Sequence, residues 1–481
     1  MAESTGHIVI LPSPGISHLI PFAELAKRLV LHHNFHVTFL VLTTTRDLSD
    51  ATKALLESLP AAVDSIFLPP VNFDDLPKYT KPSLKLSLSV TRSLPSLHHV
   101  LNSLLATNSN RLVAFLADAF GFEALEVAKG LNIPPYLFFP SNATSLSLFF
   151  HLPKLDETVS VRFMRDLPDP VKLPGCVPLH GKDLFDPIQD RKSEAYESFL
   201  NLSKRVVLAE GIIVNSFLEL EPEALKAFQE DGGEYGTRIP LIYPVGPIVQ
   251  TRSSSSNDGS ECVSWLDIQP RGSVLYVSFG SGGTLSSDQL TELAFGLEMS
   301  GQKFLWVVKR PSNESASTAY LSEGQSQFDP ADFLPNGFLE RTRDRGLVVT
   351  YWAPQTQILS HGSTGGFISH CGWSSTLESV VNGVPLIAWP LFAEQKLNAV
   401  LLEEGLKVAL RPKAEENGVV RREEIAKVVK VLMDKGSEEG KKVRDRMEEL
   451  KQAAAKAIDT DGSSIKALSD LAYTLKNKAA N

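Results

Sequence analysis

The chain has 481 residues, of which 43% are hydrophobic and 21% charged, a composition typical of a globular protein with two or three domains. Its 47 basic and 56 acidic residues give a net charge of −9. This charge argues against nucleic acid or an anionic membrane as the main partner, because both attract a basic surface. Three cysteines far apart in the sequence predict neither a disulfide framework nor a paired-cysteine metal site, and they favour a reducing compartment, for which we expect the cytoplasm.

The N-terminal segment, MAESTGH, has no basic region before its short apolar run, so we expect no signal peptide. The most apolar long segment, residues 379–393, is interrupted by asparagine, glycine and proline, so we expect no membrane-spanning helix. Three N-x-S/T triplets, at Asn142, Asn201 and Asn313, are then expected to be chance occurrences.

The first half of the chain alternates short apolar runs with amphipathic segments. Buried strands are predicted at residues 8–11, 37–42, 112–116, 136–139 and 212–214. Between the first two, residues 19–31 place apolar side chains on one broad helical face. Strand, helix and strand at this spacing predict a parallel α/β sheet.

A proline- and glycine-containing motif and a serine-rich stretch, together residues 243–260, suit an inter-domain linker. Strands of a second α/β series are predicted at residues 274–279, 304–308, 347–349, 366–368 and 385–388. The first helix of this series is expected to begin at a capping box formed by Ser286 and Gln289 and to end at Gly301.

Two further segments of the second half are polar. Residues 311–330 are expected to form an irregular insertion, and the densely charged residues 437–457 a helix with a solvated face.

Two parallel sheets joined by a linker place the working cleft between them. Ligands of such sheets bind beyond the carboxyl ends of the strands, so the chemistry is expected in the loops that follow the strands.

The loop after the first predicted strand, residues 12–21, contains His18 at the point where a helix begins. A histidine at this edge can act as a general base near neutral pH, and helix capping or packing is the alternative. Asp118 follows the strand predicted at 112–116. A carboxylate there can hold a histidine in one tautomer and stabilise its protonated form, and a helix N-cap is the alternative.

In the second half, the glycine-rich segment 280–283 (GSGG) directly follows a strand, so its N–H groups can approach a phosphate. It is not the G-x-G-x-x-G fingerprint, because residue 285 is leucine. A nicotinamide-dependent oxidoreductase would need that fingerprint, and neither half of the chain has one.

The predicted strand at 366–368 runs into HCGWSS and then a helix. This order gathers His370, Ser374 and Ser375 around a helix N-terminus, which suits a diphosphate. A metal site at His370 and Cys371 is not expected, because no second pair of ligands lies at the required spacing.

Four more side chains near this segment suit a nucleotide sugar. Glu378 lies one helical turn further on, within reach of ribose hydroxyls, and Trp352 offers a flat face on which a base can stack. Glu394 and Gln395 come from another loop at the same edge, and a carboxylate with an amide suits a polyol.

Residues 352–395 resemble the 44-residue signature of plant secondary-product UDP-glycosyltransferases, with W-A-P-Q, H-C-G-W, E and E-Q in their expected places. The resemblance covers essentially the whole chain. The segments HLPKLDETVS, LPGCVPLHGKDLFDP and LIAWPLFAEQ are most similar to the hydroquinone (arbutin-forming) glucosyltransferase subgroup, which also takes coniferyl, chlorophenol and indoxyl-type acceptors.

The resemblance implies the GT-B fold, with two Rossmann-like parallel-sheet domains facing a central cleft. Residues 1–245 would bind the acceptor and residues 263–460 the UDP-sugar, with a linker at 246–262. Residues 461–481 would form a C-terminal helix that packs back on the N-terminal domain.

The resemblance also implies a role for each matching residue. In the donor site, Trp352 would stack on uracil, Ala353 contact its edge, Gln355 and Glu378 hold the ribose, Ser281, His370, Ser374 and Ser375 hold the diphosphate, and Trp373, Glu394 and Gln395 hold the sugar. In the acceptor site, His18 would be the base, Asp118 its partner, and Phe120, Phe149 and Leu184 the walls of the pocket.

The expected reaction is an inverting transfer of glucose from UDP-glucose to a hydroxyl of a small phenolic acceptor, which gives a β-glucoside. No metal or other cofactor is expected, since UDP-glucose is a co-substrate, and the protein is expected to be a monomer. One alternative is glucosylation of aromatic amines at the same site. A non-catalytic nucleotide-sugar-binding protein is the other, but it would lack the base and its partner, and both are present.

The sequence departs from the family pattern at two positions. Asparagine usually follows H-C-G-W, whereas here Ser374 offers a hydroxyl that can still donate to phosphate but reaches less far. The penultimate residue of the signature is usually aspartate, and here it is Glu394, as in the hydroquinone-type subgroup. We expect both changes to tune donor affinity or sugar choice without abolishing the site.

Overall fold

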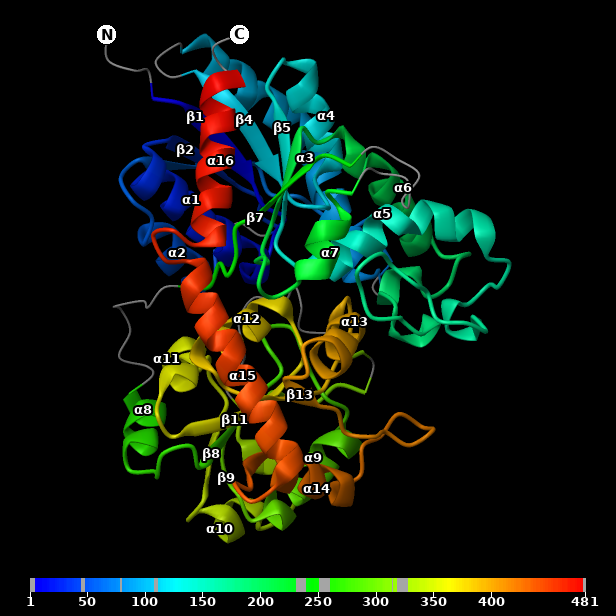
Figure 1. Ribbon diagram of the computed structural model, residues 1–481, viewed down its shortest axis with the longest axis vertical. Helices are drawn as coiled ribbons and strands as arrows, with labels where there is room; N and C mark the ends of the chain where they lie inside the picture. Colours follow the sequence, from blue (N-terminus) through cyan, green and yellow to red (C-terminus); the bar gives the residue numbers. More distant parts are fainter. Residues whose placement is uncertain are drawn as a thin grey trace. The chain divides into compact units, whose positions relative to one another are not determined.

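A computed structural model of the chain describes residues 5–44, 48–77, 80–107, 111–230, 239–250, 260–313, 315–317 and 328–478. The chain divides into two compact units (Figure 1): unit 1 comprises Met1–Val249 with Lys456–Asn481, and unit 2 comprises Gln250–Ala455. Most of the predicted linker and part of the predicted insertion at 311–330 lie outside the described residues.

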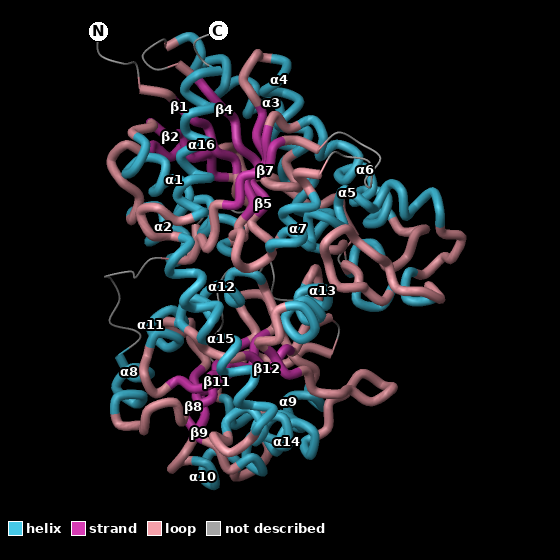
Figure 2. The backbone as a smooth tube through the Cα atoms, in the orientation of Figure 1, coloured by secondary structure: helices cyan, strands magenta, loops and turns pink. Residues whose placement is uncertain are grey.

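Unit 1 is built on a parallel sheet of seven strands in the order β3-β2-β1-β4-β5-β6-β7. The strands are β1 His7–Leu11, β2 His36–Val41, β3 Val63–Phe67, β4 Leu112–Ala117, β5 Pro135–Phe139, β6 Gly211–Val214 and β7 Leu241–Pro244. The helices are α1 Ile16–His33, α2 Asp50–Glu57, α3 Pro82–Ala106, α4 Phe122–Gly130, α5 Ala143–Thr158, α6 Glu194–Arg205, α7 Pro222–Ala227 and α16 Ser463–Lys478. Figure 2 shows the strands as one layer with helices packed around them.

Unit 2 is built on a second parallel sheet, with six strands in the order β10-β9-β8-β11-β12-β13. These strands are β8 Val274–Ser278, β9 Lys303–Val307, β10 Gly346–Val349, β11 Thr364–Ser369, β12 Leu386–Ala388 and β13 Ala409–Leu410. The helices are α8 Ser260–Asp267, α9 Ser287–Ser300, α10 Phe338–Thr342, α11 Gln355–Ser360, α12 Trp373–Asn382, α13 Gln395–Val400, α14 Arg422–Met433 and α15 Glu438–Ala457.

All ten strands predicted from the sequence are present, and the two-sheet α/β fold class is confirmed. Three strands were not predicted: β3, β7 and β13, each at an edge of its sheet. Strands inside a parallel sheet are buried on both faces and form apolar runs, whereas an edge strand keeps polar or exposed residues. In β3 (VDSIF) three of five residues are exposed, so no apolar run marks it.

Half of the predicted capping box at the start of α9 is wrong. The Ser286 hydroxyl accepts the Gln289 N–H at 3.2 Å, as predicted, and Gly301 ends the helix in the left-handed conformation. The Gln289 side chain, however, does not turn back to Ser286. Its amide donates to the carbonyl of Val420 at 3.0 Å and accepts the N–H of Val420 at 2.9 Å. Gln289 therefore pairs with the buried peptide groups of Val420, just before α14. A buried peptide group without a partner costs more than an uncapped N–H at an accessible helix start.

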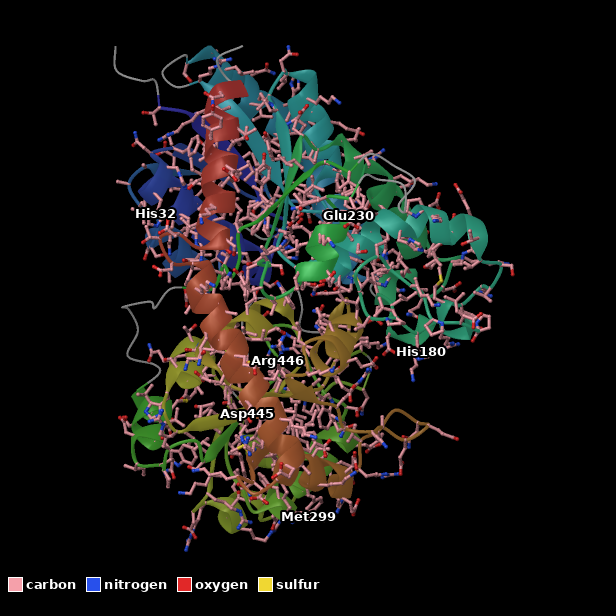
Figure 3. The ribbon with its side chains drawn as sticks, in the orientation of Figure 1. His32, His180, Glu230, Met299, Asp445 and Arg446 are labelled. Carbon is pink, nitrogen blue, oxygen red and sulfur yellow. The ribbon has the colours of Figure 1, made fainter. Side chains whose placement is uncertain are left out.

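The charged helix α15 is amphipathic. Val443, Met447 and Leu450 are buried at helical spacing, whereas charged side chains such as Asp445 and Arg446 lie on the outer surface (Figure 3). The prediction of a solvated charged face is confirmed for this helix.

The last helix, α16, belongs to unit 1 and runs beside α1 over the sheet (Figure 1). Leu468, Leu471 and Leu475 are buried in the same core as residues of β1 and β2. Close to its start, the Ser463 hydroxyl donates to Glu219 Oε2 at 2.8 Å. The C-terminal segment therefore completes the core of the N-terminal sheet.

Candidate active site

Each sheet has one topological switch point, which is the place where the strand order reverses. The loops after the two neighbouring strands there lead to opposite sides of the sheet. In unit 1 this point lies between β1 and β4, and in unit 2 between β8 and β11. Open parallel sheets bind their ligands in the crevice at this point, beyond the carboxyl ends of the strands. His18 and Asp118 follow β1 and β4, and the glycine-rich loop and His370 follow β8 and β11.

In unit 1, His18 and Asp118 form a hydrogen-bonded pair, with Nδ1 of His18 3.0 Å from Oδ2 of Asp118. Asp118 is buried and receives three more hydrogen bonds: from the N–H and hydroxyl of Ser13, at 2.9 and 2.7 Å, and from the N–H of Phe120 at 3.0 Å. Asp118 is not the N-cap of α4, because Gly121 occupies that position. The capping alternative considered for this aspartate is therefore wrong.

The surroundings of Asp118 keep its carboxyl ionised. Burial alone would raise the pKa of this group, but the hydrogen bond and charge of His18 and the hydrogen bonds from Ser13 hold the pKa of Asp118 below its usual value. An ionised carboxylate on Nδ1 favours the tautomer that has its proton there, which makes Nε2 the basic atom of the ring. The His18 side chain is 13% exposed, so a small molecule can reach it.

One aromatic ring contacts His18, and it leads into a group of packed rings. Phe120 lies edge-on to His18 with ring centroids 5.8 Å apart, and it also contacts Phe199 at 6.1 Å. Phe149 lies 5.4 Å from Phe199 and 5.4 Å from Phe139, and 5.8 Å from Phe185. We call these five phenylalanines the aromatic cluster. Four of these rings are buried, and Phe120, the ring next to the histidine, is partly exposed.

Of the three residues predicted for the acceptor pocket, the aromatic cluster contains Phe120 and Phe149. Leu184 is fully buried beside Phe185 in the chain, and its role stays a prediction. Phe139, Phe185 and Phe199 were not predicted. Phe139 could have been found, because it ends a predicted strand at the functional edge.

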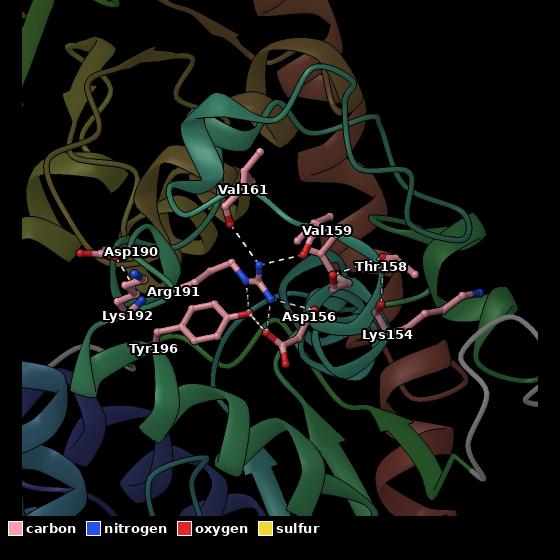
Figure 4. A network of polar contacts seen from close by, with 10 residues as sticks. Lys154, Asp156, Thr158, Val159, Val161, Asp190, Arg191, Lys192 and Tyr196 are labelled. Carbon is pink, nitrogen blue, oxygen red and sulfur yellow. Dashed lines mark hydrogen bonds and ion pairs between the residues drawn. The ribbon is translucent and has the colours of Figure 1, made fainter.

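A polar network anchors the segment that carries Phe185 (Figure 4). Arg191 donates to the carbonyls of Val159 and Val161 at 2.7 and 3.0 Å, and to the Asp156 side chain at 2.9 Å. The Tyr196 hydroxyl donates to the same carboxylate at 2.6 Å. The network ties the end of α5 to the start of α6, on both sides of the loop between them.

In unit 2, His370 directly follows β11, and its ring packs against the glycine-rich loop that follows β8. A Cβ added at Gly280 would lie 2.5 Å from the His370 ring, and one added at Gly372 would also clash with it. Both glycines therefore allow the backbone to approach the ring closely. Burial, with a smaller contribution from the charge of Lys309, lowers the pKa of His370 to about 4. The imidazole is therefore neutral at pH 7.

The start of α12 has the form of an anion site. The N-cap residue is Gly372, and no side chain caps the helix. Cys371 adopts a left-handed conformation (φ 65°), and the Asn398 amide holds its carbonyl at 2.9 Å. The start of this ten-residue helix, which no side chain caps, can receive an anionic ligand.

The residues predicted to hold the ribose are brought together. The Gln355 amide donates to Glu378 Oε2 at 2.7 Å and to the Ser375 hydroxyl at 2.9 Å. Burial raises the pKa of Glu378 to about 7, against the opposing effect of the Gln355 hydrogen bond. Ser375 was predicted on the diphosphate; its hydroxyl accepts from Gln355 and keeps its proton to donate, so its role stays a prediction. Trp352 is 57% exposed, as a stacking surface requires.

The residues predicted to hold the sugar differ in how they are placed. Glu394 is the N-cap residue of α13 and is half-buried, after Ala393 in a left-handed conformation. The side-chain oxygen of Gln395, Oε1, accepts hydrogen bonds from the N–H groups of Leu391 and Phe392, each at 2.9 Å. This oxygen shapes the loop itself, so only the amide nitrogen is left for a ligand. Trp373 is buried.

Three remaining positions complete the predicted set. Ala353 is buried beside the exposed Trp352. Ser281, in the glycine-rich loop, and Ser374, in the first turn of α12, are half-buried. Within the described ranges, no three His, Cys, Asp or Glu side chains gather in a group that could hold a metal ion. No helix in that part of the chain is both long enough and apolar enough to cross a bilayer.

Comparison with known proteins gives a consistent result. Residues 245–435 match the family model described as UDP-glucoronosyl and UDP-glucosyl transferase. The chain is 56% identical to hydroquinone glucosyltransferase from Rauvolfia serpentina, over all of both chains, and 54% identical to UDP-glycosyltransferase 72B1 from Arabidopsis thaliana, over 99% of this chain and 98% of the relative.

Two solved structures resemble it closely. One is Phytolacca americana UGT2 complexed with UDP-2-fluoro-glucose and pterostilbene, with a TM-score of 0.88 and 51% identity, covering 99% of this chain and all of that one. The other is a UDP-glucosyltransferase from Polygonum tinctorium capable of glucosylating indoxyl, in complex with 3,4-dichloroaniline, with a TM-score of 0.90, 49% identity and the same coverage. The chain is a UDP-glycosyltransferase and belongs to the UDP-glucosyl transferase family of plants, with the GT-B fold.

Proposed function

We propose that the protein transfers glucose from UDP-glucose to the hydroxyl of a small phenolic acceptor, with inversion at the anomeric carbon. The observation that carries this proposal is the pairing of His18 with an ionised, buried Asp118 next to a cluster of aromatic rings. The glycine-rich and His370 loops at the other switch point suit the diphosphate of the donor. The hydroquinone glucosyltransferase relative supports the choice of sugar and acceptor class.

In the proposed reaction, the acceptor hydroxyl gives its proton to Nε2 of His18. Its oxygen forms a bond to the anomeric carbon while the bond from that carbon to the β-phosphate oxygen breaks, and the electron pair leaves with UDP. Asp118 stabilises the imidazolium that forms. Attack from the face opposite UDP turns the α-linked donor into a β-glucoside.

We expect no metal ion to be required. The charge that grows on the leaving diphosphate would meet the N–H groups at the start of α12, which no side chain caps. A chelator such as EDTA should then leave the transfer rate unchanged. A loss of rate that Mg²⁺ restores would contradict this part of the proposal.

The acceptor is proposed to be a flat aromatic ring bearing a hydroxyl, because the aromatic cluster lies beside the proposed base. An aromatic amine is a second candidate, favoured by the 3,4-dichloroaniline bound to the Polygonum tinctorium relative. For an aniline the same histidine would take the proton from nitrogen.

Matched acceptors test the proposal. The purified protein would be given UDP-glucose, UDP-galactose or UDP-xylose with hydroquinone, 3,4-dichlorophenol, 3,4-dichloroaniline or cyclohexanol. We expect the mass of a monoglucoside from UDP-glucose with the phenols, and a β coupling constant in the proton spectrum. Absence of product from every phenol, or an α product, would contradict the proposal.

The cellular compartment and the oligomeric state of the protein are also part of the proposal. All three cysteines are unpaired, two of them buried, which suits the reducing cytoplasm. We propose a cytoplasmic monomer. Cell fractionation and light scattering of the purified protein would test the two statements separately.

A further inference from the structure

Lys309 is a cation at the functional edge of unit 2 for which the proposed reaction has so far given no role. It lies two residues beyond β9, the strand next to β8 in the sheet, so it is at the same edge as the glycine-rich loop. The Lys309 ammonium donates to the carbonyl of Ser281 in that loop. The side chain is half-buried.

The charge of Lys309 has no counter-ion among the described residues, where no carboxylate forms an ion pair with it. Burial lowers the pKa of its ammonium to about 8, and no acidic group opposes this effect. The Lys309 ammonium is partly removed from water and has one carbonyl acceptor but no counter-ion, whereas charges removed from water are normally paired or bind a charged ligand. Arg422 of the same unit, by contrast, contacts Glu292 at 2.5 Å.

A second, independent observation lies at the same place. Nδ1 of His370 is buried and has no hydrogen-bond partner among the described residues, although buried polar atoms are nearly always bonded. Lys309 is close enough to His370 for its charge to act on that ring. The uncapped start of α12 follows His370 after two residues.

These features ask for one kind of ligand. The ligand must accept from an ammonium that has no counter-ion, a neutral imidazole with an unpaired nitrogen, and the start of a helix. It therefore needs several oxygens and more than one negative charge. A diphosphate meets this requirement, whereas a single carboxylate cannot reach all three.

We propose that Lys309 binds the diphosphate of the sugar donor directly and neutralises the charge left on it when the glycosidic bond breaks. The inference rests on the proposed function of the same site and adds a residue to it. Lys309 remains protonated throughout. It donates hydrogen bonds to phosphate oxygens while the electron pair of the broken bond moves onto the β-phosphate. Its contact with Ser281 holds the glycine-rich loop beside the same group.

Binding of UDP and of uridine to the same variants separates this role from a structural one. Lys309→Met removes the charge and keeps most of the length of the side chain. We expect its affinity for UDP to fall about 10–100-fold, as for loss of a charge-assisted hydrogen bond, and its affinity for uridine to stay within about twofold. Lys309→Arg should keep UDP affinity within about threefold, and it serves if the methionine variant does not fold.

Lys303→Met is the matched control, because Lys303 begins the same strand and its ammonium contacts Gln269 Oε1 at the opposite end. We expect it to bind UDP and uridine as the unaltered protein does. At saturating UDP-glucose, Lys309→Met should also lower kcat about tenfold, since leaving-group stabilisation is lost.

Wild-type affinity for UDP in Lys309→Met would overturn the inference, and so would a parallel loss of UDP and uridine binding, which would indicate only a structural role. If the unaltered protein binds UDP but glucosylates no phenol, the proposed function fails, while the UDP-to-uridine ratio still decides the role of Lys309. If it binds no UDP, both proposals fail.

Discussion

The two sheets place a histidine at the same position, after a strand at the switch point, but surround it differently. His18 in unit 1 has a buried carboxylate on Nδ1. No carboxylate among the described residues contacts His370 in unit 2, and its neighbours are Lys309, two glycines and the start of α12. The first ring is paired with a carboxylate, whereas in the second environment burial keeps the ring neutral.

The difference shows that equivalent positions in the two sheets give a histidine different surroundings: a carboxylate for His18, and burial with a nearby ammonium for His370. In the proposed reaction, Asp118 stabilises the imidazolium that forms when His18 accepts the proton. His370 stays neutral near pH 7, so it can contribute a hydrogen bond to an anionic ligand without exchanging a proton. One sheet edge is thus suited to activate an acceptor and the other to hold a leaving group.

The largest effect is expected at His18. His18→Ala should lower kcat by at least about 10²-fold, because general-base catalysis contributes about 10²–10⁴-fold. UDP affinity should stay nearly unchanged, since the nucleotide is assigned to unit 2. Steady-state kinetics with a weakly acidic alcohol acceptor and calorimetry with UDP would measure the two quantities.

His32→Ala is the control for this variant, because His32 lies at the exposed end of the same helix (Figure 3) and should have no effect. A highly acidic phenol is a poor acceptor for the test, because it ionises without a base. Near-full activity of His18→Ala on the alcohol would show that His18 is not the base.

A second prediction concerns the buried carboxyl of Glu378. Its pKa is raised from 4.5 to about 7 in the folded protein, so the folded state holds a proton that the unfolded chain loses first. Stability therefore falls as pH rises from about 4.5 to 7, by up to about 3 kcal/mol, and the full penalty remains above pH 7. Glu378→Gln removes the penalty. It should raise the melting temperature relative to the unaltered protein at pH 8 but not at pH 4.5.

The control is Glu292, whose pKa is lowered by Arg422 and which should behave in the opposite way. Its contribution to stability is present above pH 4.5 and is lost as the pH falls below that value, so Glu292→Gln should lower the melting temperature at pH 8. If Glu378→Gln is also destabilised at pH 8, the carboxylate is stabilised by its surroundings and the burial argument is wrong.

The third prediction tests the neutral state of His370. His370→Ala should weaken UDP binding about tenfold, as for one hydrogen bond to a charged ligand. A pKa of about 4 means that the ring carries no proton charge at pH 6.5 or 7.5. The ratio of the UDP affinity of the unaltered protein to that of His370→Ala should then be the same at both pH values in calorimetric titrations. A larger ratio at pH 6.5 would show that His370 binds UDP in its charged form.

The strands and the switch-point loops could be predicted because inner strands of parallel sheets are continuous apolar runs and functional side chains follow them. The edge strands β3, β7 and β13 lack that signal. Lys309 also follows a predicted strand, so its place at the edge was available from the sequence. That no described carboxylate faces it depends on packing, which the sequence does not display.

The long loop between α5 and α6 limited the prediction of the acceptor site. Phe185 and Phe199 belong to the aromatic cluster, and the contacts of Arg191 and Tyr196 with Asp156 hold the ends of this segment together. No periodicity in the sequence reports such contacts between side chains 35 or 40 residues apart. For the same reason, the pairing of Gln289 with Val420 could not be foreseen.

The smallest effect is expected at Ser374, in the first turn of α12. Asparagine, the usual residue of the family, would extend an amide toward the diphosphate, where serine offers a short hydroxyl. The backbone N–H groups of the helix start are present with either residue, and they carry most of the anion binding. Ser374→Asn should therefore leave the Michaelis constant for UDP-glucose unchanged or lower it by at most about tenfold, without altering the acceptor range. Donor kinetics of the two forms decide between this expectation and a rearranged loop, in which asparagine would clash and donor affinity would fall sharply. Ser375→Asn is the contrasting variant, because the Ser375 hydroxyl already accepts from Gln355 at 2.9 Å, and its loss should weaken donor binding.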